Sequence, residues 1–368
     1  MSFDGSRVVL EHADSGLDLG WLDDDGRLDK EKLLAWVGED EKVPVEGGQP
    51  MILSEIFQKW EHGQELYIKD WHACRERGKE ERRTLGVPWD RDWLDPYCQA
   101  RHLDDFRFVY LGPKGTGTGL HSDVRGTFSS SWSILGWKLW TFLECPRRGS
   151  SQFEGLIVAS DGGERLLSLD GQQERWPDLT LTWKTLGREN SLVHHFVLRH
   201  PESSVLVILQ PPNTKIYVPS LLYHLVQNLG HLDPDLGSPE LVLSVNHNWI
   251  NHLNVLTVFR SLLNDLEAVE KELDHLKTEM TAEEWLSTRE TVLKSNSGWD
   301  LTDFWDFVRW TLQSKTAERV DTIVQCIDIF LAGRDTRAWP DVVEGYIKEC
   351  LEMVQNYPTA QPLPTSTS

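Results

Sequence analysis

Cysteine is scarce in this 368-residue chain, and its few cysteines do not form a recognisable framework. The five are Cys74, Cys98, Cys145, Cys326 and Cys350, an odd number with no two of them in a CxxC pair. This pattern disfavours both a secreted scaffold held by disulfides and a zinc module built on paired cysteines. We therefore expect a protein of a reducing compartment.

Long apolar runs are also missing, and we expect no secretory leader. No stretch of 18 apolar residues occurs, and the first five residues, MSFDG, do not open a basic segment followed by an apolar one. The sequence predicts no membrane association, and we expect the protein in the cytoplasm, with the nucleus as a second location.

Basic residues are outnumbered. The chain has 37 Lys and Arg against 58 Asp and Glu, which gives a net charge of −21. Proteins that bind phosphate backbones need Lys and Arg to displace counterions, so we expect no direct binding to nucleic acid. A basic peptide or protein is a better partner for the negative electrostatic field of this chain. The length allows one large or two ordinary domains.

Two side chains that can bind a metal lie two residues apart in His121-Ser122-Asp123, and a third candidate, His224, lies far downstream. On a strand, residues 121 and 123 would point to the same face. Two histidines and one carboxylate are the ligands of a facial triad that leaves positions open on Fe(II). His-x-Asp alone is common by chance, so Thr118 and Lys138 nearby strengthen the interpretation.

Four glycines, Gly112, Gly115, Gly117 and Gly119, precede this histidine. A phosphate-binding loop is one interpretation, but no Gly-Lys-Ser/Thr ending follows, and we expect a strand rather than a helix after it. We interpret the glycines as a turn that leads into a strand.

Hydrophobic periodicity predicts the remaining elements. Strands are expected at 43–45, 65–69, 106–110, 132–142, 205–209, 215–218 and 241–245, and helices at 28–37 and 55–60. Residues 228–239 are rich in turn residues. Apolar residues three or four apart predict a long helix at 255–280, and the spacing of Thr281 and Glu284 predicts a capping box. Further helices are expected at 302–312, 319–331 and 340–356.

Four sequence words carry a family resemblance: LYIKDWHACR (66–75), DFRFVY (105–110), HSD (121–123) and SVNHNWIN (244–251). Through them, residues from about 40 to 315 resemble a JmjC domain, the double-stranded β-helix of Fe(II)- and 2-oxoglutarate-dependent oxygenases. The chain is most similar to the branch called JmjC domain-containing protein four, lysyl hydroxylases that act on the translation termination factor.

The resemblance implies a mainly β fold with α, a cupin-like jelly roll followed by a helical C-terminal region. We expect an acidic lead-in at 1–40 and the JmjC domain at 41–250, with a loop-like insertion at 147–202. A helical region should follow at 251–357, and a disordered tail at 358–368. The C-terminal helices are expected to pack on the barrel or to close a homodimer.

The resemblance also implies a site. His121, Asp123 and His224 would be the catalytic ligands of Fe(II), with 2-oxoglutarate as cosubstrate and O2 as oxidant. The cosubstrate is a dianion, so its distal carboxylate needs a fixed cation and hydroxyl donors. Lys138 matches the family position of that cation, although a lysine on a strand can also face solvent.

Other pocket positions follow from the same resemblance. Tyr67 and Thr118 match hydroxyl positions of related enzymes, and Asn246 matches a further pocket position. Three histidines, His194, His195 and His200, fall in the expected insertion and are interpreted as surface or packing residues. His247 does not match a ligand position.

The chain also departs from the family pattern. The usual Trp-Ser-x-Asn word is displaced to residues 131–135, and Trp137 replaces an arginine. The usual Pro-Ser-Gly-Trp before the distal histidine is here Pro219-Ser220-Leu221-Leu222. These changes keep the three ligands and the lysine but alter the pocket wall, on which substrate choice and turnover depend.

The function implied is hydroxylation of a protein side chain, with a lysine of the translation termination factor as the first substrate. A histone N-methyl-lysine demethylase is an alternative, opposed by the absence of chromatin-reader or zinc-finger spacing and by the negative charge. A catalytically silent JmjC scaffold is a second alternative, supported by the altered wall and opposed by the intact ligands.

Overall fold

The computed structural model describes residues 5–13, 20–38, 40–73, 92–144, 156–160, 163–167, 204–230, 240–333 and 338–357. The chain divides into two compact units. The sheet unit comprises Met1–Val87, Asp104–Asp123 and Phe128–Asn248, and the helical unit comprises Pro88–Leu103, Val124–Thr127 and Trp249–Ser368. None of the described helices is both long and apolar enough to cross a membrane.

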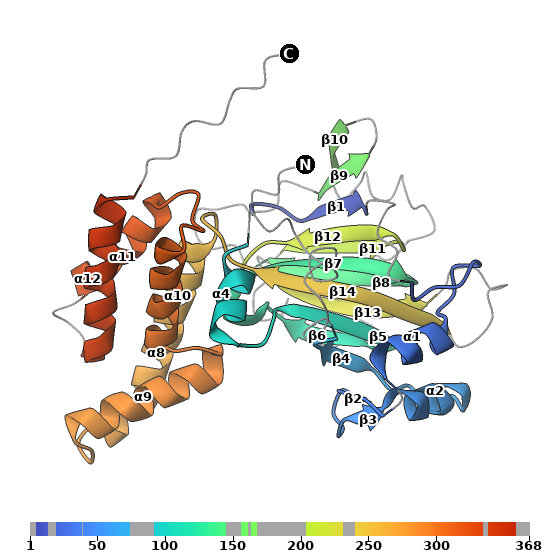
Figure 1. Ribbon diagram of the computed structural model, residues 1–368, viewed down its shortest axis with the longest axis horizontal. Helices are drawn as coiled ribbons and strands as arrows, with labels where there is room; N and C mark the ends of the chain where they lie inside the picture. The colour runs from blue at the N-terminus through green and yellow to red at the C-terminus, as the bar shows by residue number, and fades with distance from the viewer. Residues whose placement is uncertain are drawn as a thin grey trace. The chain divides into compact units, whose positions relative to one another are not determined.

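One layer of the sheet unit is an eight-stranded sheet with the order β10-β9-β1-β12-β7-β14-β5-β4 (Figure 1). Its strands are β1 (Val9–His12), β4 (Ile68–Trp71), β5 (Arg107–Pro113), β7 (Phe128–Leu135), β9 (Leu156–Ser160), β10 (Gly163–Leu167), β12 (Thr214–Val218) and β14 (Leu241–Trp249). The register is antiparallel in the pairs β1–β12, β12–β7, β14–β5 and β4–β5, whereas β1 and β9 run parallel.

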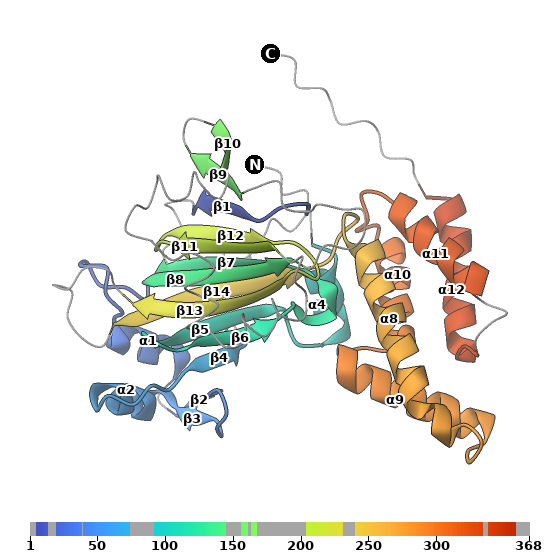
Figure 2. The same cartoon turned by 180° about the vertical axis from the view of Figure 1, so that it is seen from behind.

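The other layer is a four-stranded sheet with the order β11-β8-β13-β6. Its strands are β6 (Gly117–His121), β8 (Trp137–Glu144), β11 (Ser204–Gln210) and β13 (Tyr223–Gly230), and they are seen from the other side in Figure 2. The two layers share one apolar core, in which Leu10 and Ile216 of the large sheet cluster with Phe142, Ile208 and Val226 of the small one. Two facing antiparallel layers of this kind form a jelly roll, so the predicted fold class is confirmed.

Two helices pack on the outer face of the large sheet: α1 (Lys30–Val37) and α2 (Leu53–Glu61), with the hairpin of β2 (Lys42–Val43) and β3 (Met51–Ile52) beside them. Their apolar side chains cluster with Val109 and Leu111 of β5 and with Leu243 and Val245 of β14. Because side chains alternate along a strand, the even-numbered residues of β5 and β14 face inward, toward the small sheet.

Several expectations differ from the structure. Strand β6 ends at His121, so Asp123 does not lie on a strand. Asn228 belongs to β13 rather than to a turn, because the strand continues to Gly230. The long C-terminal helix ends at Leu273 and is followed by a 3-10 turn. Within 147–202 the structure describes β9 and β10; the other residues of that range and the tail at 358–368 lie outside the described residues.

The helical unit contains α4 (Leu94–Arg101), α8 (Val255–Leu273), α9 (Ala282–Ser297), α10 (Leu301–Gln313), α11 (Asp321–Gly333) and α12 (Asp341–Gln355). The predicted capping box is present, because Thr281 and Glu284 exchange hydrogen bonds at the start of α9. Helix α4 was not predicted.

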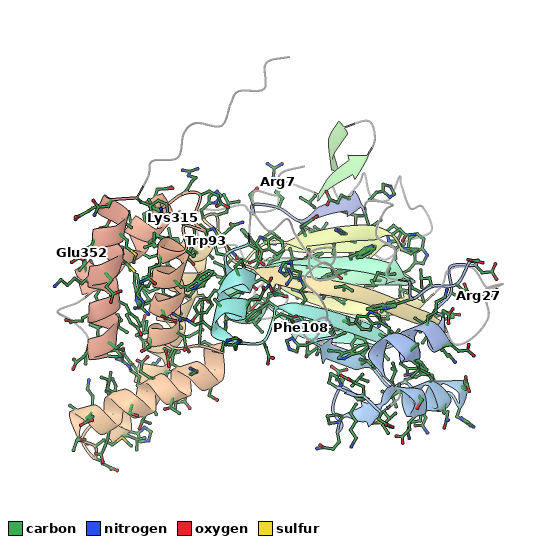
Figure 3. The ribbon with its side chains drawn as sticks, viewed as in Figure 1. Arg7, Arg27, Trp93, Phe108, Lys315 and Glu352 are labelled. Atoms are coloured by element: carbon green, nitrogen blue, oxygen red, sulfur yellow. The ribbon has the colours of Figure 1, made fainter. Side chains whose placement is uncertain are left out.

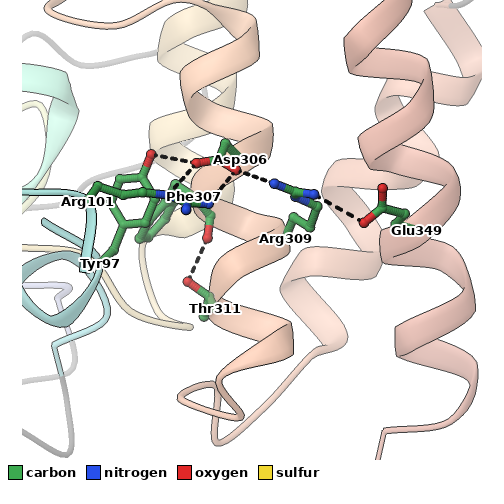
Figure 4. Close-up of polar contacts among 7 residues, drawn as sticks. All are labelled: Tyr97, Arg101, Asp306, Phe307, Arg309, Thr311 and Glu349. Atoms are coloured by element: carbon green, nitrogen blue, oxygen red, sulfur yellow. Dashed lines mark hydrogen bonds and ion pairs between the residues drawn. The ribbon is translucent and has the colours of Figure 1, made fainter.

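A shared carboxylate connects three helices of this unit (Figure 4). Asp306 of α10 accepts hydrogen bonds from Tyr97 and Arg101 of α4, at 3.2 Å and at 2.7 and 2.9 Å. It also accepts one from Arg309 at 2.7 Å, and Arg309 in turn contacts Glu349 of α12 at 3.3 Å. Burial alone would raise the pKa of Asp306, but the hydrogen bonds from Arg309 and Arg101 outweigh it and lower that pKa.

We expect Asp306→Ala to lower the free energy of unfolding by about 2–3 kcal/mol, because two guanidinium groups lose their common acceptor. The pKa of Asp306 is lower in the folded state than its ordinary value of 3.8. Its contribution to the free energy of unfolding is therefore complete above pH 3.8 and is lost as the pH falls through the folded-state pKa. Urea denaturation measures the loss. As a control, Asp321→Ala removes an exposed pair with Arg319 and should change the free energy by less than about 1 kcal/mol. Equal losses in both variants would contradict the prediction.

Candidate metal centre

Two imidazoles face each other across neighbouring strands of the small sheet. His121 of β6 and His224 of β13 are directly paired in the register, and their ring centroids lie 4.3 Å apart. The strands can approach closely here because Gly117 lacks a side chain; a Cβ there would collide with the carbonyl oxygen of Val226. With Asp123, the ligand atoms of all three residues lie within 4.8 Å of one another.

The hydrogen bonds of both histidines set their tautomers. Nδ1 of His121 lies 2.8 Å from the carbonyl oxygen of Gly119, and Nδ1 of His224 lies 2.8 Å from that of Leu222. A carbonyl can only accept, so each Nδ1 carries the proton and each Nε2 keeps a free lone pair. Burial lowers the pKa of His224, against the opposing charge of Asp123. Both imidazoles are thus suited to bind a metal in their neutral form.

The carboxylate of Asp123 is positioned by side chains rather than by a strand. Its Oδ2 accepts a hydrogen bond from Ser129 of β7 at 2.8 Å, and its Oδ1 accepts one from Asn248 of β14 at 3.1 Å. The prediction that strand alternation aligns residues 121 and 123 was wrong, because β6 stops at His121. Asn248 lies in one of the family words, whereas no sequence signal marks Ser129.

One cavity contains this group of ligands. Its lining is Tyr67, Tyr110, Thr118, His121, Asp123, Ser129, Lys138, Trp140, His224, Val226, Asn246 and Asn248. The seven site residues expected from the sequence therefore surround a single cavity. Sequence reasoning missed Tyr110, Ser129, Trp140, Val226 and Asn248.

Lys138 points into the molecule and is 2 % exposed. Its Nζ donates to Ser244 Oγ at 2.6 Å and lies 3.4 Å from Ser131 Oγ, between the rings of Tyr110 and Trp140. Among the described residues, no carboxylate forms an ion pair with it. Burial lowers the pKa of Lys138 to about 7. A buried ammonium without a counter-charge fits a site whose anion comes from a ligand.

Two further polar groups fit a bound dicarboxylate. The Oδ1 atom of Asn246 is buried and has no hydrogen-bond partner among the described residues. Burial raises the pKa of Tyr67 well above its ordinary value, so its hydroxyl stays protonated and can donate. The triad fits Fe(II), and Lys138 with these neighbours fits the distal carboxylate of 2-oxoglutarate.

The remaining histidines do not join this cavity in the described residues. His247 is buried on β14, but its odd position places it on the outer face, opposite Asn246 and Asn248. His194, His195 and His200 lie outside the described residues.

The altered wall before His224 adopts an unusual backbone. Leu221 has a φ of 62°, a left-handed conformation that favours glycine and costs a side-chain-bearing residue about 1–2 kcal/mol. The family word has glycine at this position, so in this chain a leucine adopts the left-handed conformation that glycine adopts without strain. Leu222 packs against the core between the two sheets while its carbonyl holds His224.

No protein-family model matches the chain. A mouse protein described as 2-oxoglutarate and iron-dependent oxygenase JMJD4 is 28% identical over 249 residues, which cover 66% of this chain and 50% of the relative. The Drosophila melanogaster homologue of JMJD4 is 27% identical over 300 residues, 82% of this chain and 59% of the relative. An Arabidopsis thaliana protein described as arginine-specific demethylase JMJ20 is 26% identical over 281 residues, 70% of this chain and 52% of the relative.

The chain spans about half the length of the curated relatives that it matches first. Several JMJD4 proteins nonetheless match it over two thirds or more of its own length. The resemblance inferred from the four sequence words is confirmed by these matches, and the jelly roll agrees with it. The chain is thus similar to the JmjC proteins of the branch described as 2-oxoglutarate and iron-dependent oxygenase JMJD4.

Proposed function

We propose that this chain is an Fe(II)- and 2-oxoglutarate-dependent protein hydroxylase whose substrate is a lysine of the translation termination factor. The single observation that carries the reaction class is the cavity in which two imidazoles and a carboxylate lie with a buried ammonium that has no ion pair among the described residues. One end of this cavity suits a metal, and the other suits a dicarboxylate that chelates it.

The residues of the chain have separate tasks in this proposal. His121, Asp123 and His224 would hold the iron, which supplies the chemistry that inserts one atom of O2 into a C–H bond while 2-oxoglutarate becomes succinate and CO2. Ser129 and Asn248 fix both oxygens of Asp123, so the ligand geometry is set before the metal arrives.

The cosubstrate end is arranged to bind and orient. Lys138 would pair with the distal carboxylate, and Ser131 and Ser244 fix the position of its ammonium. Tyr67 and Thr118 would donate hydroxyl hydrogen bonds. Trp140 covers both Lys138 and His224, at 5.7 and 5.5 Å from its ring, and so limits the access of water to this end.

The substrate part of the proposal rests on two observations. The sequence words at 66–75 and 244–251 resemble the branch that modifies the termination factor, and the net charge of −21 favours a basic target. A demethylase is a second candidate, because the Arabidopsis relative is described as an arginine-specific demethylase.

The experiment incubates the purified protein with the termination factor, methylated histone peptides, Fe(II), 2-oxoglutarate and ascorbate, and maps masses by fragmentation. We expect a lysine of the termination factor to gain the mass of one oxygen atom, with the histone peptides unaltered. The variant His121→Ala is the control and should give no product.

The other outcomes separate the alternatives. Loss of a CH₂ mass from the methylated peptides, with the termination factor unaltered, would replace the proposal by demethylation. Succinate formation without either mass change would support the proposed reaction class and contradict the proposed substrate. No succinate under any condition would support a scaffold.

A further inference from the structure

A row of aromatic side chains, Tyr110 and Phe108 on β5 and Phe106 just before it, leads out of the metal cavity. Val109 and Leu111 pack in the core beneath α1 and α2, so alternation places Phe108 and Tyr110 on the inner face. Tyr110 lines the metal cavity. Phe106 and Phe108 are half-buried, and their ring centroids lie 6.3 Å apart in an edge-to-face arrangement. Phe108 is labelled in Figure 3.

The neighbouring strand shows that this row borders the cavity. Phe108 is directly paired with Asn246 of β14, and the backbone N–H of Asn248 donates to the carbonyl of Phe106 at 2.9 Å. Directly opposed residues share a face of the sheet and have Cβ atoms about 5 Å apart. Asn246 and Asn248 both line the cavity, and Asn248 holds Asp123. The two phenylalanines thus lie beside the carboxylate side of the metal group.

A histidine and a buried carboxylate complete the group. The ring of His72 lies 4.9 Å from that of Phe108. Its Nδ1 lies 2.9 Å from Oδ1 of Asp105, and because a carboxylate accepts, Nδ1 carries the proton in neutral His72 and Nε2 remains an acceptor. Asp105 is 3 % exposed, and its Oδ2 is buried with no hydrogen-bond partner in the part of the chain that the structure describes. A buried carboxylate oxygen left unpaired is unfavourable unless a ligand or another group completes it.

We propose that Phe106, Phe108, His72 and Asp105 form a recognition subsite for a cationic side chain of the protein substrate, next to the metal cavity. Aromatic faces attract ammonium and guanidinium groups, and the negative charge of the nearby carboxylate also attracts these cations. None of these four side chains is a lysine or an arginine that would bind an anion, and Lys138 lies within the cavity itself. The subsite rests on the proposed protein hydroxylase and names the chemistry of the residue that it recognises.

A purely structural role is the competing explanation. In this explanation, the contact between His72 and Asp105 does no more than connect the end of β4 with the chain before β5. In that case its loss would lower stability without any preference for a cationic ligand. A binding measurement with charged and neutral probes separates the two explanations.

The probes are Nα-acetyl-lysine amide and Nα-acetyl-norleucine amide, which differ by the ammonium group. Ligand-observed saturation-transfer NMR follows their binding to the full chain with Zn(II) and 2-oxoglutarate present. We expect the wild type to prefer the lysine probe, and Phe108→Leu and Asp105→Asn to weaken lysine binding roughly three- to tenfold. Phe108→Tyr keeps an aromatic face and should retain the preference.

The control is Glu46→Gln, which removes an exposed negative charge from the sheet unit and should leave the preference unchanged. If Phe108→Leu or Asp105→Asn fails to fold, judged by its thermal unfolding, His72→Gln removes the imidazole that contacts Phe108 instead and should also reduce the preference. Equal binding of the two probes to the wild type, or an unchanged preference in the folded variants, would overturn the subsite.

The same variants, with Fe(II) in place of Zn(II), are assayed for succinate formation in the absence of a protein substrate. A preserved lysine preference without succinate would contradict the proposed function and leave the subsite standing. Succinate formation without a lysine preference would support the proposed function and contradict the subsite.

Discussion

His224→Ala should reduce iron affinity by more than about 100-fold and abolish succinate formation, because loss of hydrogen-bond partners around metal ligands alone costs about 10–100-fold. His121→Ala and Asp123→Ala should behave in the same way, since each removes one of three ligands whose atoms lie within 4.8 Å of one another. Iron binding is measured anaerobically through the charge-transfer band that forms with 2-oxoglutarate.

A graded series makes this test sharper. Ser129→Ala removes the hydrogen bond at 2.8 Å to Asp123 but keeps every ligand, so we expect a loss of affinity of about 10- to 100-fold. His62→Ala changes an exposed histidine at the end of α2 and should leave iron binding at the wild-type value. Wild-type iron affinity in His224→Ala would exclude that residue from the metal centre.

Lys138→Met should raise the 2-oxoglutarate requirement roughly 30-fold or more while iron binding persists. The substitution removes the cation that faces a buried carboxylate, which costs about 2–5 kcal/mol when one partner is left unpaired. Titration of 2-oxoglutarate, followed by the same charge-transfer band or by succinate, measures the change. An unchanged requirement would assign the distal carboxylate to another residue.

The same substitution should stabilise the ligand-free protein. Lys138 is a buried ammonium without an ion pair among the described residues, so a neutral side chain of similar length should raise the free energy of unfolding by about 1–4 kcal/mol. A variant that is more stable yet binds the cosubstrate more weakly would distinguish loss of a binding cation from general damage. Lower stability together with weaker binding would indicate general damage.

The lowered pKa of Lys138, about 7, also gives the wild type a characteristic pH dependence. As pH rises through 7 the free enzyme loses the ammonium, so 2-oxoglutarate affinity should fall. Between 7 and 10.5 the unfolded chain binds the proton and the folded chain does not, so the stability of the ligand-free protein should rise with pH. Lys138→Met should lack both effects.

The sequence was informative where chemistry and periodicity coincide. Residues His121, Asp123 and His224 could be named because metal ligands belong to few residue types and because the surrounding sequence words resemble the JmjC family. The core strands could be placed because apolar and polar residues alternate along β5 and β14. The helices after residue 254 were found because α8 and α10 carry apolar residues three or four apart.

Other parts of the site depend on which strands become neighbours, which no local pattern reveals. Nothing in the run FSSSWS distinguishes Ser129 and Ser131 from other serines. Their role follows from the fold, in which β7 directs their side chains inward, toward Asp123 and Lys138. Helix α4 was missed because LDPYCQAR is short, contains proline and lacks an amphipathic period. Its position depends on Asp306, more than two hundred residues away along the chain.

The hydrogen bonds of the three ligands divide the centre into a robust part and an evolvable part. Both imidazoles are oriented by main-chain carbonyls two residues before them, of Gly119 and Leu222, and a carbonyl is present whatever side chain mutation places there. Asp123 instead takes its orientation from the side chains of Ser129 and Asn248, each of which a single nucleotide change can remove. Over many generations, sequence drift can therefore retune the carboxylate arm of the centre while the two imidazoles keep their alignment.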